Sequence, residues 1–439
     1  MTKSPDAPDA PGVTPPPEIS APVTADAATA QRLATLRRRT QAVLIAGQIL
    51  GGLGIATGIA LAAVLAKDVS GSEALSGLAS TASVAGPALL AMPLAALMSA
   101  RGRRPGLVLA YLIGALGAGV VVLGAVVGSF PLLLAGLVGF GAASSANLAA
   151  RFAAADLAEP DHRGRAISTV VWATTIGAVL GPNIAAPAGE SVAGLGIPAT
   201  AGPFVWAAGV FLVAALVVAV LLRPDPLLTA RALAAPEEGQ EAAAARSLRA
   251  GMRAVREAAG ARLALVTVAA SHTAMVSIMS MTPVALSHHG AGIQLIGLVI
   301  SGHIAGMYAF SPVMGWLSDR LGRLSVIGLA VGLLCVAALL AGTAGPSHGQ
   351  TAAGLFVLGL GWSAGLVSGS ALLTDSVPQA ARAAVQGLSD FIMNTAAGIG
   401  GLMAGLIVAR AGYGWLNLVG ACLLLPMAAL AVRGVLRRA

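Results

Sequence analysis

The chain has 439 residues, of which 57% are hydrophobic and 10% are charged. A soluble globular protein carries about 25% charged residues. Together with a mean hydropathy of +0.85, this composition excludes an ordinary soluble domain and predicts an integral membrane protein. The net charge is +8, and its distribution along the chain decides whether it indicates a nucleic-acid partner or a membrane topology.

Apolar segments of about twenty residues recur from Gln41 onward, and each is long enough to cross a bilayer as a helix. The twelve predicted segments are 41–66, 76–98, 107–127, 131–155, 166–186, 203–222, 261–286, 293–317, 325–343, 351–373, 384–408 and 413–434. They predict an all-α membrane protein with six helices in 41–222, a central loop at 223–258 and six helices in 259–434. Residues 1–40 are rich in Pro and Ala without an apolar stretch, which predicts a disordered cytoplasmic tail and no signal peptide. Residues 435–439 form a second short tail. Cys335 and Cys422 lie within apolar segments and are predicted to be buried free thiols.

The basic residues follow the topology of these segments. With the N-terminus inside, Lys67 and Arg410 are the only Lys or Arg that fall in outer loops. This asymmetry obeys the positive-inside rule and predicts a multi-pass protein of the cytoplasmic membrane, with both tails and the central loop in the cytoplasm. The stretch "PEEGQEAAAARSLRAGMRAVREAAGAR" of the central loop is expected to form an amphipathic helix on the inner surface. We therefore expect lipid, and no nucleic acid, as the surrounding partner.

The two halves of the chain repeat each other. Asp156 and Arg163 in "ADLAEPDHRG" match Asp375 and Arg382 in "TDSVPQAARA" at an offset of about 219 residues. In the loop after the second helix of each half, "ALMSARGRR" lies opposite "GWLSDRLGR" at nearly the same offset. Two parallel six-helix repeats are the architecture of major facilitator transporters.

The stretch "GWLSDRLGR" resembles the loop signature G-x-L-x-D-R-x-G-R of the major facilitator superfamily, and this resemblance implies a latch that closes the inner gate. The matching residues are Gly315, Leu317, Asp319, Arg320, Gly322 and Arg323. Chemically, the aspartate can cap a neighbouring helix N-terminus and the arginines can bind acidic partners or lipid headgroups. The alternative is a charged loop that only obeys the topology rule. Ser99 stands where the first half would have the aspartate, so we expect any latch there to be weaker or differently built.

The stretch "IGAVLGPNIAA" contains Gly177, Gly181 and Pro182, which resemble the G-x-x-x-G-P element common in antiporters. The alternative is close helix packing through small residues. The direction of transport therefore stays open between uptake and proton-coupled export.

Methionine and histidine gather in the seventh and eighth predicted helices. Met275 and Met279 are one turn apart on the seventh, and His303 and Met307 are one turn apart on the eighth. At 1.5 Å per residue, Met275 lies about 16 Å and His303 about 15 Å below the outer surface, near the bilayer midplane where such transporters bind substrates. A short loop joins the two helices, which are expected to lie antiparallel and side by side, so that the four side chains converge.

Thioether and imidazole groups form a soft donor set that suits Cu(I) and poorly suits Mg²⁺ or Ca²⁺. The alternative is ordinary packing, because methionine fills apolar cores. His272 is one turn from Met275 and is either an extra ligand, a proton acceptor or a hydrogen-bonded histidine. This pattern of paired Met-x-x-x-Met and His-x-x-x-Met motifs is similar to that of the CcoA-like transporter family. The resemblance implies copper uptake through Met275, Met279, His303 and Met307.

Some members of that family are associated with riboflavin uptake, so a small organic solute is the alternative substrate and a non-transporting membrane receptor is a minor one. Asp390 lies inside the predicted helix 384–408, with Asn394 one turn further on and Arg382 about two turns before. An intramembrane carboxylate is a candidate proton relay, and the alternative is a structural ion pair. The sequence contains no GxxxxGK motif and no visible nucleophile–base arrangement. We expect a monomeric protein that is not an enzyme and has no cofactor.

Overall fold

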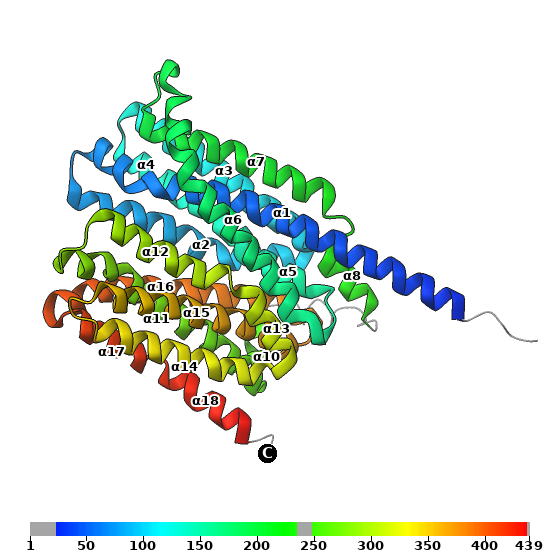
Figure 1. Ribbon diagram of the computed structural model, residues 1–439. Coiled ribbons are helices and arrows are strands. Elements are labelled where there is room, and N and C mark those ends of the chain that lie inside the picture. The colour runs from blue at the N-terminus through cyan, green and yellow to red at the C-terminus, as the bar shows by residue number, and fades with distance from the viewer. Residues whose placement is uncertain (1–22, 235–247, 437–439) are drawn as a thin grey trace, which may run out of the picture. The chain divides into compact units, whose positions relative to one another are not determined.

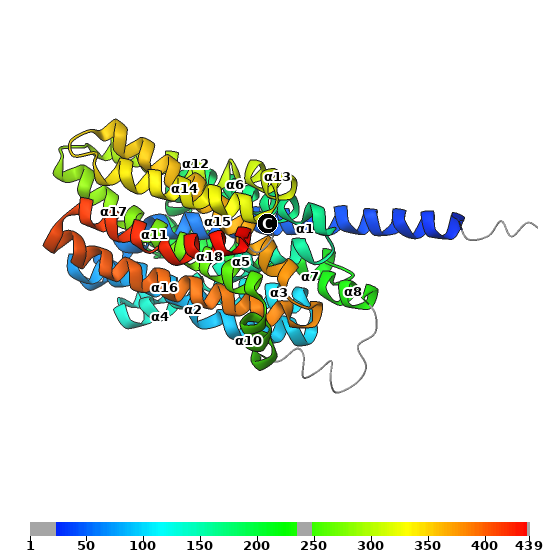
Figure 2. The ribbon, with the colours of Figure 1, turned by 90° about the horizontal axis from the view of Figure 1, so that it is seen from below.

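The computed structural model describes residues 23–234 and 248–436, and this part of the chain is built from helices without strands (Figures 1 and 2). Eleven helical spans in it are long and apolar enough to cross a membrane. The count is twelve if Pro160–Gly181 and Asn183–Glu190, which meet at a 44° bend, are taken as one span. The predicted all-helical membrane fold is confirmed.

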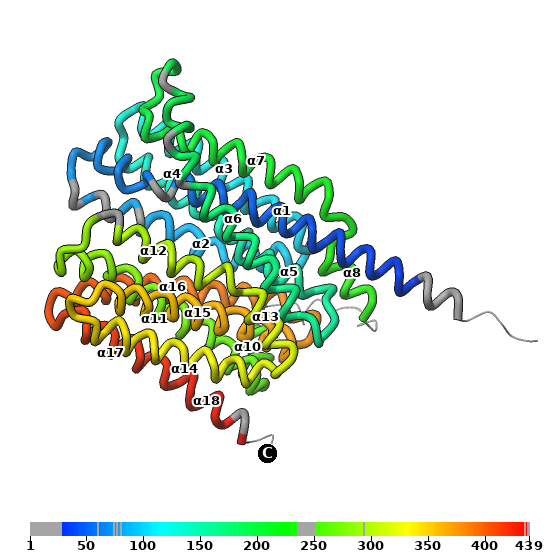
Figure 3. Tube along the Cα trace, viewed as in Figure 1, coloured from blue at the N-terminus to red at the C-terminus, as the bar shows by residue number. Residues whose placement is uncertain are grey.

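The helices of the first half are α1 (Val23–Ser70), α2 (Glu73–Arg101), α3 (Arg103–Val127), α4 (Phe130–Gly141), α5 (Ala143–Asp156), α6 (Arg163–Glu190) and α7 (Gly202–Leu221). Those of the second half are α11 (Ala259–His288), α12 (Ile293–Tyr308), α13 (Ser311–Leu321), α14 (Arg323–Gly342), α15 (His348–Ser376), α16 (Arg382–Ala411), α17 (Tyr413–Cys422) and α18 (Leu425–Leu436). Three of the predicted segments thus consist of two consecutive helices, α4 with α5, α12 with α13 and α17 with α18, and the trace in Figure 3 runs on through each break.

Residues 1–39 and 40–439 form two separate units. The prediction of a disordered tail up to residue 40 is wrong from Val23 onward, where α1 begins, and the rest of that prediction lies outside the described residues. The helical part contains no proline and is rich in Ala, Leu and Arg, which are strong helix formers. In the central loop, α8 (Pro226–Leu233) and α10 (Leu248–Glu257) are helical, and α10 packs against α11 and α16. The first part of the predicted amphipathic helix lies outside the described residues.

The repeat seen in the sequence is also present in the backbone. The short 3-10 turns Pro160–His162 and Gln379–Ala381 directly precede α6 and α16, the equivalent helices of the two halves. Gly102 and Gly322 end α2 and α13 with φ of 92° and 87°. Since glycine adopts positive φ without strain, both copies of this loop need it for their sharp turn.

Two helix crossings bring the halves together, α2 with α16 and α6 with α13. A Cβ atom at Gly387 would overlap the Cβ of Ala95, and one at Gly315 would overlap the Oγ of Ser168. Ala95 and Gly315 hold equivalent positions in the repeat, as do Ser168 and Gly387. Small residues at both crossings therefore let the backbones approach closely.

The buried apolar residues form two large cores. One lies in the first half and contains Phe140, Phe204 and Phe211. The other lies mainly in the second half, contains Met275 and Trp362, and extends to Phe152 and Ile167 of the first half. The free thiols Cys335 and Cys422 belong to neither core and are exposed on α14 and α17. The prediction that they are buried is wrong. In a bilayer the outer face of a helix is as apolar as its packed face, so the sequence pattern does not separate the two.

Candidate transport site and gate

A buried ion pair links the two halves. Arg151 Nη2 on α5 lies 2.5 Å from Asp390 Oδ1 on α16, and the two side chains are only 1% and 10% exposed. Arg151 also donates from Nε to Ser370 Oγ at 3.1 Å and from Nη1 to the Leu148 carbonyl at 3.0 Å. A charge in an apolar interior needs such partners, because desolvation is otherwise too unfavourable. The pair is therefore a buried ionic contact between the halves, in which Arg151 has further hydrogen-bond partners.

Sequence reasoning missed Arg151 as the partner of Asp390. The nearer basic residue in sequence, Arg382, donates instead to Gln379 Oε1. Asn394 donates to the backbone carbonyl of Asp390 at 2.7 Å and has no hydrogen bond to its carboxylate. One signal could have found Arg151, which is the only basic residue within the predicted membrane segment 131–155. An intramembrane arginine of this kind is expected to have a functional partner.

Asp319 caps a helix of the opposite half. Its Oδ1 accepts the backbone N–H of Gly164 at 2.9 Å and its Oδ2 that of Arg165 at 2.8 Å, both in the first turn of α6. These N–H groups have no partner within α6, and the positive end of the helix dipole favours a carboxylate there. Arg323, which follows Asp319 by four residues in the second half, forms an ion pair with it. The aspartate of the loop signature is thus a helix cap between the halves.

Further ion pairs extend this contact. Arg323 Nε lies 3.1 Å from Asp375 Oδ2, and Arg163 of the first half pairs with the same carboxylate. Arg323 Nη2 also donates to the Pro160 carbonyl at 2.7 Å. We call Arg163, Asp319, Arg323 and Asp375, with the first turn of α6, the gate network. The end of the bundle that carries it is called the basic end.

Arg320 is not part of the gate network. Its guanidinium lies 5.3 Å from the centre of the Trp316 ring and forms no ion pair within the described ranges. Gly315 lies at the crossing with α6, where a side chain would not fit. Gly322 has a positive φ, which the turn of the loop requires. The loop signature therefore contains residues with separate structural roles.

The first half carries a different arrangement at the equivalent loop. Arg103, at the position of Arg323, pairs with Asp156 at 2.7 Å and donates to Gln386 of the second half. The Ser99 backbone carbonyl accepts a hydrogen bond from Arg231 at 2.7 Å, and no side chain of the described residues caps α16. The carboxylate at this loop belongs to Asp225 of the central segment. Asp225 accepts a hydrogen bond from the Arg104 N–H at 2.7 Å and also caps α8. The two copies of the loop are thus built from different contacts.

His303 has a defined tautomer. The side chain is fully buried, and Nδ1 lies 2.8 Å from the Leu355 carbonyl. Because a carbonyl only accepts, Nδ1 carries the hydrogen and Nε2 keeps a lone pair, which has no partner among the residues that the structure describes. Metal-binding histidines commonly donate their other ring N–H in this way. Met307, one turn further on, is also buried.

The helices that carry the two motifs are not packed side by side as predicted. α11 and α12 touch each other little, and each packs along α15. The reason lies in the glycines between α12 and α15, since a Cβ at Gly359 would lie 2.8 Å from the Met307 nitrogen. Met275 and Met307 are nevertheless buried in one apolar cluster, with Met279 partly buried against it. The cluster extends through most of the second half, from Ala261 to Ala431, so Met275 and Met307 share an extended core against which Met279 packs.

His272 has a different environment. Trp362 Nε1 donates to His272 Nδ1 at 2.8 Å, and the Trp362 ring stands edge-on to Tyr308 at 5.5 Å. Because the indole only donates, a neutral His272 carries its hydrogen on Nε2 and has no lone pair free for a metal. This geometry favours the hydrogen-bonded interpretation of His272 over the ligand interpretation.

The glycines of the antiporter-like element lie against α1. A Cβ at Gly177 would lie 2.5 Å from the Leu53 nitrogen, and one at Gly181 would lie 2.9 Å from the Thr57 nitrogen. The 44° bend in this span falls between Gly181 and Asn183, at Pro182, where proline removes a helical hydrogen bond. These residues therefore set a close and bent packing of α6 on α1.

Two six-helix repeats in contact with each other are the architecture of membrane transporters built from parallel repeats. The sequence profile of the Major Facilitator Superfamily matches residues 43–293 and 263–439. The chain is 37% identical over 391 residues to the uncharacterized MFS-type transporter YddS of Bacillus subtilis, covering 88% of this chain and 89% of the relative. It therefore belongs to the Major Facilitator Superfamily and is an MFS-type transporter.

Two further proteins are similar to this chain. The structure of the proton:xylose symporter XylE bound to 6-bromo-6-deoxy-D-glucose superimposes with a TM-score of 0.72 at 16% identity, covering 91% of this chain and 95% of that one. This likeness shows the fold. The riboflavin transporter RfnT of Brucella anthropi is 28% identical over 384 residues, covering 88% of this chain and 92% of the relative.

Proposed function

We propose that this transporter takes up copper across the cytoplasmic membrane by alternating access, with the basic end facing the cytoplasm. In this proposal, the conformation described above has the cytoplasmic gate closed by the gate network. The orientation is supported by the positive-inside distribution of Lys and Arg. The substrate is supported by the resemblance of the Met275, Met279, His303 and Met307 motifs to those of the CcoA-like family.

The observation that carries the copper proposal is the unpartnered Nε2 of His303. A fully buried imidazole lone pair without a donor is unfavourable unless a bound group satisfies it. Met307 places a thioether one turn away, and Met275 is buried in the same cluster. Imidazole and thioether donors select Cu(I) over hard cations, and no carboxylate belongs to the set.

Proton coupling is assigned to Asp390 in the same proposal. Its carboxylate joins α16 to Arg151 on α5, so the charge of this group acts directly on the contact between the halves. Protonation would neutralise the carboxylate and leave the Arg151 cation without its partner. The halves would then separate more easily at the basic end, which couples proton uptake to the conformational change.

A small organic solute such as riboflavin is the second candidate substrate, and the 28% identity with RfnT favours it. The His303 Nε2 lone pair would then accept a hydrogen bond from an N–H or O–H group of the solute.

Uptake of radiolabelled copper and of riboflavin, measured in parallel in cells with and without the protein, tests the proposal. We expect copper accumulation to depend on the protein and riboflavin accumulation to be independent of it. The opposite pattern would overturn the copper proposal and favour the organic solute.

A further inference from the structure

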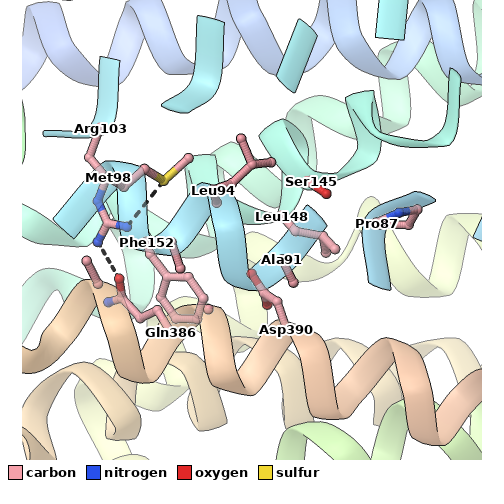
Figure 4. Close-up of a pocket in the computed structure, with 14 residues that line it drawn as sticks. Pro87, Ala91, Leu94, Met98, Arg103, Ser145, Leu148, Phe152, Gln386 and Asp390 are labelled. Carbon is pink, nitrogen blue, oxygen red and sulfur yellow. Dashed lines mark hydrogen bonds between the residues drawn. The ribbon is translucent and has the colours of Figure 1, made fainter. Parts of the chain in front are cut away.

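A small cavity of about 20 Å³ lies beside the Arg151–Asp390 pair, between α2, α5 and α16 (Figure 4). Its polar lining residues are Arg103, Ser145, Gln386 and Asp390, all of them buried. The other lining residues are apolar or glycine. A cavity holds a water molecule when it offers at least about 10–15 Å³ and two to four polar partners. This cavity has the size for one water molecule.

Two polar groups at the cavity lack hydrogen bonds from the protein. Ser145 is 7% exposed, and its Oγ has no partner among the described residues. Arg151 binds Oδ1 of Asp390, whereas Oδ2 accepts no hydrogen bond from that part of the chain. A water molecule between them would accept from or donate to the Ser145 hydroxyl and donate to the carboxylate. It would satisfy both groups at once.

The charges around the cavity select a neutral occupant over a cation. Arg103 lines the cavity, and Arg151 binds the carboxylate that also lines it. The carboxylate charge is thus already balanced by one guanidinium, and a second guanidinium stands nearby. A metal cation would be repelled and would find few oxygen ligands, whereas water is neutral and both donates and accepts.

We propose that this cavity is a water site and that Ser145 is a positioning residue, which holds the water against Oδ2 of Asp390 for proton transfer. The inference rests on the proposed coupling by Asp390. The water donates one of its own protons to Oδ2, where an O–H bond forms as the water's O–H bond breaks, and it gains a replacement proton from a solvent hydronium ion in the same step. The water is left neutral, the carboxylate becomes a carboxylic acid, and the ion pair with Arg151 loses its negative partner. The reverse step returns the proton to the water.

The test compares Ser145→Ala with Ser389→Ala. Ser389 is also buried, has an unpartnered hydroxyl and neighbours Asp390 in sequence, but it does not line the cavity. The purified full-length protein is reconstituted into liposomes, and uptake of radiolabelled copper and of riboflavin is measured with and without an inward proton gradient. Exchange of labelled for unlabelled solute across the liposome membrane, measured without a proton gradient, shows whether each variant is folded and binds the solute. A structure of the protein at a resolution that shows ordered water examines the cavity directly.

We expect Ser145→Ala to lower gradient-driven uptake about tenfold, since a misplaced proton donor forfeits most of its effect, and to leave exchange unchanged. Ser389→Ala should behave as the wild type, and a water should be seen between Ser145 and Asp390. Undiminished gradient-driven uptake in Ser145→Ala, or a cavity without ordered water, would overturn the water-site inference and leave the proposed coupling by Asp390 intact. Wild-type uptake that ignores the gradient would overturn the proposed coupling itself, and with it the proton role of this water.

Discussion

Arg151 and Asp390 form a buried ion pair of 2.5 Å that joins α5 of the first half to α16 of the second. The guanidinium also binds Ser370, which is 219 positions further along and equivalent to Arg151 in the repeat. Arg151 therefore lies where equivalent positions of the two halves meet, and the repeat is asymmetric at this point. One half contributes a cation and the other a hydroxyl and a carboxylate.

Removing one charge of this pair should destabilise the protein more than removing both. Asp390→Asn leaves a buried guanidinium without its counter-charge, and breaking a buried ion pair in this way costs roughly 3–5 kcal/mol. The double variant Arg151→Gln, Asp390→Asn removes both charges and keeps polar groups that can bond each other. Thermal unfolding in detergent should show a lower Tm for the single variant and substantial recovery in the double variant. Equal Tm values for the single variant and the wild type would contradict a stabilising pair.

The gate prediction concerns the cap that Asp319 provides to α6. Asp319→Asn retains one acceptor but loses the charge that binds Arg323 and the helix N-terminus, so we expect the closed gate to weaken by about 1–2 kcal/mol. Labelling of single cysteines at the basic end should then become several-fold faster. Arg320→Gln is the matched control from the same loop, because Arg320 contacts Trp316 outside the gate network. Similar labelling rates in both variants would show that the Asp319 contacts do not hold the gate.

A glycine substitution tests the crossing of α6 with α13. Gly315→Ala would place a Cβ in collision with Ser168 Oγ and 2.6 Å from the Gly164 carbonyl. The two helices must separate, so we expect the closed conformation to be disfavoured and transport to fall. Gly328→Ala on α14 is the control, since its Cβ would meet nothing within 4 Å. Distance measurements between spin labels on α6 and α13 check the separation, and an unchanged distance in Gly315→Ala would refute the crossing as a close contact.

The membrane segments and the repeat could be predicted because they depend on local properties. The length of an apolar segment shows that it can span the membrane. The matching positions of Asp156 and Asp375 give the offset between the two repeats. The aspartate of "GWLSDRLGR" could also be proposed as a helix cap, although its target, the first turn of α6, is known only from the fold. Which helices share a long interface was not predictable in the same way. The close approach of α12 to α15 at Gly359 separates α11 from direct packing on α12.

The partner of Asp390 could not be chosen by sequence distance, because Arg382 is nearer along the chain and Arg151 is nearer in space. The tautomer of His303 likewise depends on a carbonyl of another helix, that of Leu355. Such pairings follow from the tertiary arrangement and leave no local pattern. A charged residue inside an apolar membrane segment can still be identified from the sequence as one that needs a partner. Arg151, which lies in a stretch of alanines, is such a residue.

The proposed orientation makes a further prediction about accessibility. Cys335 and Cys422 are replaced by alanine, and single cysteines are then introduced at Arg253 on α10 and at Ser287 near the end of α11, both exposed. A membrane-impermeant thiol reagent added to intact cells should label the cysteine at 287 and leave that at 253 unlabelled until the cells are opened. Labelling at 253 from outside would reverse the topology.

In the proposed mechanism, Met275, Met279, His303 and Met307 bind copper during uptake. Exchange of methionine for leucine nearly conserves volume and usually costs under about 1.5 kcal/mol in a packed interior, so folding should survive Met275→Leu. The most direct measurement is accumulation of radiolabelled copper in liposomes that contain the wild type, the double variant Met275→Leu, His303→Leu, or the control His288→Leu at the exposed end of α11. We expect copper accumulation to collapse in the double variant and to persist in the control, with equal amounts of folded protein. Full copper accumulation by the double variant would contradict the copper site.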